Sequence, residues 1–488
     1  MTAIEPRVRR DATGPDAPVP PDWAALLPGG RLGSVAVVGP VTRSAHRAQQ
    51  ASSTARPDQL ADTVIVTDDR ASALRTAMAL VRPGGAIRVE RSRRRRRART
   101  RWLLRQRGLI DVTTWWARPD IDHPRCLIRL EDRVAAATVV RTVADRRRRT
   151  PLEVAVAWSG VADLLAREVS IMAMAPGPCT ERALAGPADG RRIDALVTPG
   201  YRRSRAVIGI ATDGTGRRLH SVAKVARRPE DDGHVAAEAA VLEDLERRAG
   251  GFAGAPQEAR VDRRAGRSVL VERAVPGEPL DRRAVRRDPV GALVVGRRWI
   301  DGLPRHEATV PAEDGRAEAL LRGPLTAVAA RPGIRAATVE VASEVLGRIE
   351  RVPLPVVFEH GDLGHPNLLV EDGTLAAVDW ERARPDGLPL HDLVFLVAYL
   401  TESLERSGGA EQLGRAVVRA LRPHGWARPE LDVHVERLAL DRSLIPALQV
   451  ACWTRHLAAR PVDMSTDGAP SREEALWMAA VDAAVGRW

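Results

Sequence analysis

One stretch, residues 356–381 (VVFEHGDLGHPNLLVEDGTLAAVDWE), constrains the fold of this chain more than any other. An apolar run leads into His-Gly-Asp at residues 360–362, and two further short apolar runs flank Asp-Gly at residues 372–373. Asp-Gly between apolar runs predicts a tight β-hairpin. Asn367 then lies at the foot of one strand, opposite Asp379 at the foot of the other.

The side chains at the feet of this hairpin suit a particular chemistry. The carboxamide of Asn367 and the carboxylate of Asp379 supply hard oxygen atoms, which Mg²⁺ prefers while taking its remaining ligands from water and substrate phosphates. Asp362 lies close by in sequence. A separate carboxylate beside the metal is what a phosphoryl transferase needs to orient an acceptor hydroxyl and take its proton. The stretch therefore indicates Mg²⁺-dependent phosphoryl transfer.

The same stretch resembles the aminoglycoside phosphotransferase and choline kinase family, the small-molecule branch of the protein-kinase-like fold. The family pattern, His-Gly-Asp with Asn five residues after the Asp and a hairpin closing in Val-Asp-Trp, stands here as HGDLGHPN and VDWE. The resemblance implies that Asp362 is the catalytic base, that Asn367 ligates the metal and that Asp379 is the main metal-bridging carboxylate. It also implies ATP and Mg²⁺ as cofactors.

Composition singles out two of the positions that this resemblance uses. Lys224 is the only lysine among 75 Lys and Arg residues, and Asn367 is the only asparagine. Arginine does not replace lysine without loss where a compact charge must reach a phosphate. Retention of these two residues favours a functional role over chance survival.

The expected kinase-like part comprises an N-lobe with its hinge at 193–280 and a C-lobe at 281–488. Lys224, in the third predicted strand, is expected to pair with Glu238 and to reach the nucleotide phosphates, as in the kinase fold. The other reading makes Glu238 an exposed residue that the dipole favours at the start of a helix. By the same resemblance Ser204 touches the phosphates, and backbone groups of Arg273 and Ala274 hold adenine.

Three histidines and one further aspartate surround the His-Gly-Asp stretch. We expect His360 to orient its backbone, whereas His365 and His391 are expected to be loop residues without assigned chemistry. The resemblance gives Asp392 a structural role, bracing the catalytic loop. In the family the acceptor binds among the C-terminal helices; here, residues 386–488 are slightly acidic, which permits an amine-bearing or neutral polyol acceptor.

The first third of the chain predicts a different fold class. Residues 1–21 are expected to be disordered, and 22–178 alternate strand-like and helix-like pieces, which indicates an α/β Rossmann-like domain. Residues 61–90 resemble the later half of a class I SAM-dependent methyltransferase, with final strands expected within 108–130 and 167–175. Because the first strand is followed by a single glycine and a proline, not a glycine-rich turn, we expect a degenerate module that does not hold SAM. Residues 179–192 are expected to be a linker.

Charge and cysteine content bear on partners and compartment. The net charge is +12, much of it in arginine clusters at 91–101 and 146–149. These clusters are either solvated faces or a dock for an anionic surface or polyanion; specific nucleic-acid recognition is not expected, because few aromatic residues interleave. Three scattered cysteines, no signal peptide and no membrane-length apolar run predict a cytoplasmic protein without a transmembrane segment.

Together these features predict a Rossmann-like domain followed by a two-lobed α+β kinase-like domain. The expected activity is transfer of the γ-phosphoryl group of ATP to a hydroxyl of a sugar, amino-sugar, aminoglycoside-like compound or amino alcohol. Two alternatives stay open at this point: a nucleotide-binding pseudokinase or scaffold, and a bifunctional methyltransferase–kinase.

Overall fold

The structure of the protein is a computed structural model that divides into two compact units. Unit 1 comprises residues 1–239 and 258–274, and unit 2 comprises 240–257 and 275–488. The described residues are 22–27, 32–54, 59–92, 94–118, 124–142, 166, 168–177, 184, 192–198, 205–264, 266–306, 314–364, 367–405, 409–460 and 471–486. No helix among them is both long and apolar enough to cross a membrane.

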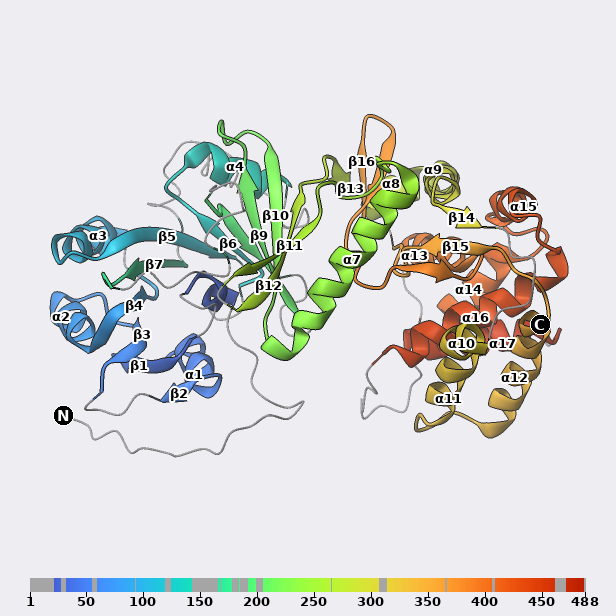
Figure 1. The fold of residues 1–488 in the computed structure, drawn as a ribbon, viewed down its shortest axis with the longest axis horizontal. Coiled ribbons are helices and arrows are strands. Elements are labelled where there is room, and N and C mark those ends of the chain that lie inside the picture. Colours follow the sequence, from blue (N-terminus) through green and yellow to red (C-terminus); the bar gives the residue numbers. More distant parts are fainter. Residues whose placement is uncertain are drawn as a thin grey trace. The chain divides into compact units, whose positions relative to one another are not determined.

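Unit 1 is built on one twelve-stranded sheet in the order β11-β12-β10-β9-β8-β6-β5-β7-β4-β3-β1-β2 (Figure 1). At one end β2, β1, β3 and β4 run parallel, and β7 lies antiparallel between β4 and β5. The strands of this end are β1 (Ser34–Val38), β2 (Ser53–Thr54), β3 (Ala61–Val66), β4 (Val81–Val89), β5 (Ile110–Arg118), β6 (Cys126–Arg129) and β7 (Val169–Met174). Strands thus occur within 108–130 and 167–175, as predicted, whereas the methyltransferase-like character of this part stays a prediction.

Among the described residues, four helices and two short 3-10 segments accompany these strands. They are α1 (Arg43–Gln50), α2 (Ala71–Leu80), α3 (Arg97–Gln106) and α4 (Arg133–Thr142), with η1 (Asp22–Leu26) and η2 (Arg94–Arg96). The Pro-Gly-Gly at 83–85 falls inside β4, where the pairing with β3 shifts register. The predicted disorder of 1–21 and the second arginine cluster at 146–149 lie outside the described residues.

The strands predicted for the kinase-like N-lobe belong to the same sheet. They are β8 (Ala195–Val197), β9 (Ala206–Thr212), β10 (Leu219–Ala226), β11 (Arg260–Arg264) and β12 (Arg267–Arg273), all paired antiparallel. Strand β8 pairs with β6 through Cys126–Val197, Leu127–Leu196 and Ile128–Ala195. The expected linker at 179–192 lies almost wholly outside the described residues, so the predicted domain boundaries stay predictions, but the strands before and after it share one sheet.

Helix α7 (Asp232–Ala249) begins in unit 1, after the short η4 (Pro229–Asp231), and ends in unit 2. It starts six residues before Glu238, so Glu238 lies within the helix and not at its start. Val235, Ala239, Leu242 and Leu245 are buried, at the spacing of one helical face.

Unit 2 combines two small three-stranded sheets with a set of helices. The sheets are β13-β16-β17 and β14-β15-β18. Their strands are β13 (Glu278–Pro279), β14 (Arg305–His306), β15 (Val356–Glu359), β16 (Leu368–Glu371), β17 (Thr374–Ala377) and β18 (Arg384–Gly387). The helices before β15 are α8 (Arg282–Arg287), α9 (Pro289–Asp301), α10 (Asp314–Ala317), the π-helical η5 (Glu318–Arg322), α11 (Gly323–Ala329) and α12 (Ala336–Glu350).

The C-terminal part of unit 2 is helical. Its helices are α13 (His391–Leu404), α14 (Ala410–Leu421), α15 (Arg428–Arg437), η7 (Arg442–Leu444), α16 (Ile445–Ala458) and α17 (Arg472–Ala484). Helix α13 is buried on nearly every side, from Leu393 to Leu400, as expected for a helix that is apolar all round. It therefore forms the centre against which the site described below is built.

Candidate functional site

The hairpin predicted around residues 372–373 is confirmed. Strands β16 and β17 pair antiparallel from Leu368–Ala377 to Glu371–Thr374. At the feet of the two strands the amide N–H of Val378 donates to the carbonyl oxygen of Asn367 at 2.9 Å. The next residue, Asp379, follows directly, so the hairpin places Asn367 and Asp379 side by side in unit 2.

The side chain of Asn367 is oriented by the residues 360–364, which we call the HGD loop. Its Nδ2 donates to the carbonyl oxygen of Asp362 at 3.0 Å. This bond uses the amide nitrogen and so leaves the role of acceptor or ligand to the Oδ1 atom. Asp379 has a positive φ of 71°, a conformation that Asp tolerates better than most residues but that is uncommon outside glycine.

The HGD loop is held from behind by a buried carboxyl group. Asp392, in the first turn of α13, accepts the amide N–H of His360 at 2.7 Å and that of Gly361 at 2.9 Å. Burial and the charge of Glu359 raise the pKa of Asp392 to about 7, against the effect of the two amide donors. The bracing role expected for Asp392 is confirmed by these contacts.

His360 connects the HGD loop to the end of the hairpin. Its Nδ1 lies 3.3 Å from the amide nitrogen of Asp362 and its Nε2 lies 3.1 Å from the carbonyl oxygen of Val378. The first contact needs Nδ1 as acceptor and the second needs Nε2–H as donor, which a single neutral tautomer satisfies. The expectation that His360 orients the backbone here is confirmed.

Asp362 is half-buried in this framework. Burial raises the pKa of its carboxyl to about 6; Arg382 opposes the rise, while Asp379 adds to it. A carboxylate of raised proton affinity that is still ionised at neutral pH can accept a proton from a hydroxyl. The HGD loop and the hairpin thus bring the carboxylate of Asp362 near Asn367 and Asp379, whose side-chain oxygen atoms can ligate a cation.

In unit 1 the predicted pair of Lys224 and Glu238 is confirmed. The Nζ of Lys224, on β10, donates to Oε2 of Glu238 on α7 at 2.6 Å, with 12% and 4% of the two side chains exposed. The reading of Glu238 as an exposed helix-start residue is therefore wrong. A buried lysine held by a carboxylate in this way is fixed in position, and its role toward a phosphate stays a prediction.

Ser204, Arg273 and Ala274 are the other residues expected to contact the nucleotide. Ser204 lies outside the described residues. Arg273 ends β12 and its guanidinium lies 3.3 Å from Glu258, with both side chains mostly exposed. The amide N–H of Ala274 donates to the carbonyl oxygen of His220 at 2.9 Å, so only its carbonyl oxygen could serve adenine.

A buried ion pair behind the HGD loop was not anticipated from the sequence. Arg455 of α16 donates from both terminal nitrogens to Glu359, at 3.0 Å from Nη1 to Oε2. Burial acts to raise the pKa of Glu359, but the charge of Arg455, together with smaller contributions, outweighs it and the pKa falls to about 2. Glu359 Oε2 also accepts the amide N–H of Leu388 at 3.1 Å, so this carboxylate joins three segments of unit 2.

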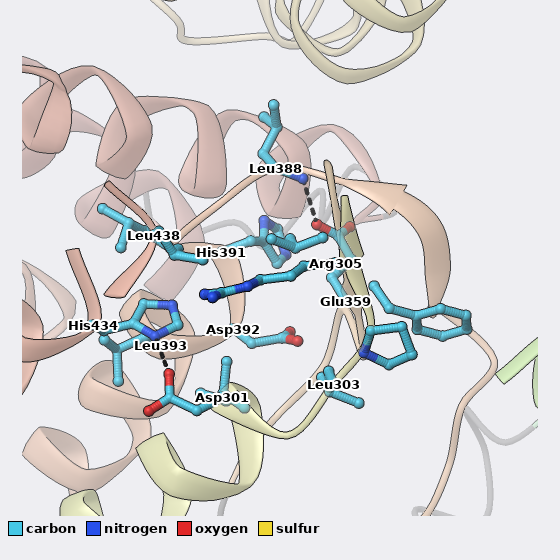
Figure 2. Close-up of a pocket in the computed structure, with 15 residues that line it drawn as sticks. Asp301, Leu303, Arg305, Glu359, Leu388, His391, Asp392, Leu393, His434 and Leu438 are labelled. Carbon is cyan, nitrogen blue, oxygen red and sulfur yellow. Dashed lines mark hydrogen bonds and ion pairs between the residues drawn. The ribbon is translucent and has the colours of Figure 1, made fainter. Parts of the chain in front are cut away.

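A small pocket lies on this side of the loop (Figure 2). Its polar lining includes Asp301, Glu359, His391, Asp392 and His434, and the Nδ1 of His434 lies 2.7 Å from Oδ1 of Asp301. None of the three predicted catalytic and metal-binding residues lines it. The pocket is therefore lined by residues that support the HGD loop, and we do not assign it to the expected nucleotide or metal.

His391 differs from its expectation, whereas His365 lies outside the described residues. His391 is not a loop residue: it is buried, begins α13, and groups with Cys452 and His456. The rings of His391 and His456 stack with an interplanar angle of 23°. Lone pairs of nearly parallel rings do not converge on one point, and His391 Nδ1 lies 3.1 Å from a nitrogen of Arg455. This group is accordingly a packed aromatic cluster, not a metal centre.

Comparison with known proteins was made against families, curated proteins and solved structures. The model of the phosphotransferase enzyme family matches residues 209–433. This protein carries a phosphotransferase-family domain. The match confirms the phosphotransferase class predicted from the sequence, and its range includes Lys224, Glu238, Asp362, Asn367 and Asp379. A search of curated proteins found no match.

Three of the solved structures that are similar to this chain are named below. An amicoumacin kinase in complex with AMP-PNP, Ca²⁺ and Ami is 14% identical, with a TM-score of 0.38, over 58% of this chain and 86% of that one. An aminoglycoside phosphotransferase from Streptomyces rimosus is 18% identical, with a TM-score of 0.33, over 54% of this chain and 90% of that one. A glucosamine kinase in complex with glucosamine, ADP and inorganic phosphate is 18% identical, with a TM-score of 0.34, over 62% of this chain and 96% of that one. At TM-scores below 0.5 these likenesses carry no conclusion about this chain.

Proposed function

We propose that the protein transfers the γ-phosphoryl group of ATP to a hydroxyl of a small molecule. The observation that carries the proposal is the joint placement of Asp362, Asn367 and Asp379 by one hairpin and one braced loop. Three residues of the types that phosphoryl transfer requires are thus held by backbone contacts of unit 2. Positioning and electrostatic stabilisation are what such transfer needs from a protein.

The donor atoms fit a divalent cation. Asn367 Oδ1 and the Asp379 carboxylate are hard oxygen ligands on adjacent strand ends, and the bond from Asn367 Nδ2 to Asp362 fixes which amide atom faces the cation. We propose Mg²⁺, which would neutralise charge on the phosphate oxygens when bound.

The chain's own residues then have separate duties. Asp362 accepts the hydrogen bond of the acceptor hydroxyl and takes its proton on a carboxylate oxygen, while the new bond to the γ-phosphorus forms and the bond from that phosphorus to the bridging oxygen of the departing ADP breaks. Lys224, fixed by Glu238, neutralises phosphate oxygens. Carbonyl groups at Arg273 and Ala274 are proposed to contact adenine, and Ser204 the phosphates. Asp392 and His360 keep the HGD loop in the conformation that Asp362 requires.

The acceptor class is proposed as sugars, amino-sugars, aminoglycoside-like compounds and amino alcohols. This rests on the family match and on the sequence resemblance. A cytoplasmic location, and a first domain that does not hold SAM, stay predictions from the sequence.

The test is Mg²⁺-dependent ATP turnover by the purified protein across a panel of these acceptors. We expect stimulation by one acceptor class and loss of turnover in Asp362→Asn, with nucleotide binding retained. Asp372→Asn is the matched control: it makes the same change at the turn of the neighbouring hairpin, at an exposed residue with φ of 49°, a conformation that Asn adopts readily. Undiminished turnover in Asp362→Asn refutes the assignment of the base. ATP binding without turnover on any acceptor would favour a pseudokinase or scaffold.

A further inference from the structure

Helix α3 (Arg97–Gln106) carries an exposed aromatic residue at the centre of a basic face. Trp102 is 57% exposed, and among the described residues it is the one aromatic member of the exposed large apolar side chains. Arg99 and Arg105 lie three residues before and after it and are exposed, as is Arg95 one turn earlier. Residues three and four apart share one face of a helix, so the three arginines and Trp102 project together.

The opposite face of α3 fixes the helix to unit 1. Arg97 is 3% exposed and donates from Nε to the carbonyl oxygen of Ser92 at 3.0 Å. Thr100 and Leu104 are buried, and Arg101 donates to Thr114 Oγ1 on β5 at 3.1 Å. The outer face is therefore presented by a helix packed onto the sheet, as α3 beside β5 and β7 in Figure 1 illustrates.

The arginines of this segment divide by their partners. On the inner side Arg96 pairs with Asp69 at 3.1 Å. On the outer side Arg95, Arg99, Arg105 and Arg107 make no side-chain hydrogen bond or ion pair to any other part of the described chain. Three of these guanidinium groups, those of Arg95, Arg99 and Arg105, lie on the side of the exposed indole and form with it a surface of uncompensated positive charge.

The chemistry of this face fits an anionic phospholipid surface. Indole rings settle at the headgroup level of a bilayer, where one side is apolar and the other is wet, and guanidinium groups bind phosphate through paired N–H donors. A nucleic-acid face would need several stacking aromatics or base-reading polar groups, whereas here there is one indole and one amide, Gln106. We infer that α3 docks this protein reversibly onto membranes rich in anionic phospholipid through Trp102 and its flanking arginines.

The test is co-sedimentation of the full chain with vesicles of phosphatidylcholine alone and of phosphatidylcholine with phosphatidylglycerol. We expect the protein to bind the vesicles that contain phosphatidylglycerol and not those of phosphatidylcholine alone. This binding should weaken as the salt concentration rises. Arg99→Gln with Arg105→Gln should lower the partition coefficient about 25-fold, at about fivefold for each arginine. Trp102→Ala should weaken binding as well, while leaving its salt dependence unchanged.

The matched control is Arg415→Gln with Arg419→Gln, which removes the same charge from exposed positions of α14. This double variant should bind the anionic vesicles within about twofold of the parent. Equal binding by the α3 and α14 variants, or no vesicle binding by the parent, overturns the inference. Parallel titration with duplex DNA and RNA completes the test: binding to these that depends on Trp102, without vesicle binding, would reassign the face to nucleic acid. Far-ultraviolet circular dichroism of each variant checks that the fold is intact.

Discussion

Replacement of Glu359 by Gln should destabilise unit 2, because it leaves the guanidinium of Arg455 buried without its carboxylate. The side chain of Glu359 is 1% exposed and that of Arg455 is 13% exposed. Glutamine keeps the shape and one acceptor, so it can still receive the amide N–H of Leu388. The substitution therefore removes mainly the charge.

The loss in the free energy of unfolding follows from the shifted pKa of Glu359 and from the burial of its ion pair. Folding moves the pKa of Glu359 from 4.5 to about 2, and at 1.36 kcal/mol for each pKa unit this corresponds to about 3 kcal/mol of stability. Removal of one partner from a buried ion pair costs about 3–5 kcal/mol in general. We expect the free energy of unfolding of Glu359→Gln to fall by about 3 kcal/mol at pH 7.

The pH dependence has a defined sign. Because the folded-state pKa of Glu359 lies below its unfolded value, its contribution is fully present above pH 4.5 and is lost as the pH falls toward 2. The stability difference between parent and variant should therefore narrow by about 1 kcal/mol between pH 7 and pH 4. Urea unfolding of both proteins at several pH values, followed by tryptophan fluorescence, measures this difference.

The control for this experiment is Glu411→Gln on α14. The carboxylate of Glu411 is 64% exposed and lies 4.0 Å from Arg415, so its loss should change stability by less than about 1 kcal/mol. A stability difference for Glu359→Gln that is absent, or that does not change with pH, would refute the reasoning that the charge of Glu359 supports the loop.

Two further substitutions test other parts of the site. Lys224→Arg can keep an ion pair with Glu238, yet kcat/KM for ATP should fall at least ~100-fold, because a guanidinium does not reach a phosphate as a compact point charge does; parental activity in steady-state assays would contradict this role. Gly361→Ala should lower the thermal midpoint well below that of Gly373→Ala. Both glycines have φ of 78°, but an added Cβ meets the carbonyl oxygen of Arg382 at Gly361 and meets nothing at Gly373. Equal midpoints would show that this crowding is relieved.

The features predicted correctly from the sequence were those set by short-range patterns. Asp-Gly between apolar runs fixed the hairpin and its register, and with it the proximity of Asn367 and Asp379. Lys224 and Glu238 were paired because the kinase-fold resemblance implies such a pair between a strand and the helix that follows it, and the two side chains do form a hydrogen bond. Each inference depended on local geometry together with the spacing of one family pattern.

The features that escaped prediction depend on contacts between distant segments. Arg455 and Glu359 are 96 residues apart, and a chain with 75 basic and 63 acidic residues offers many equally plausible pairings. His391 was expected to be a loop residue, whereas Leu390 takes a positive φ of 69° and the helix starts directly after it. The sequence also could not divide the arginines of α3 into buried and exposed sets.

The pairing of β6 with β8 has a consequence for how this protein can be divided. Strand β8 is short and is covered on one side by β9 and on the other by β6. A fragment starting at residue 193 would retain the phosphotransferase match yet expose the backbone donors and acceptors of β8 along a new sheet edge. Exposed edges of this kind recruit other strands and promote aggregation. The first third of the chain thus covers the edge of β8 through β6. We expect its removal to make the remaining phosphotransferase part aggregate, whether or not the first third binds a ligand of its own.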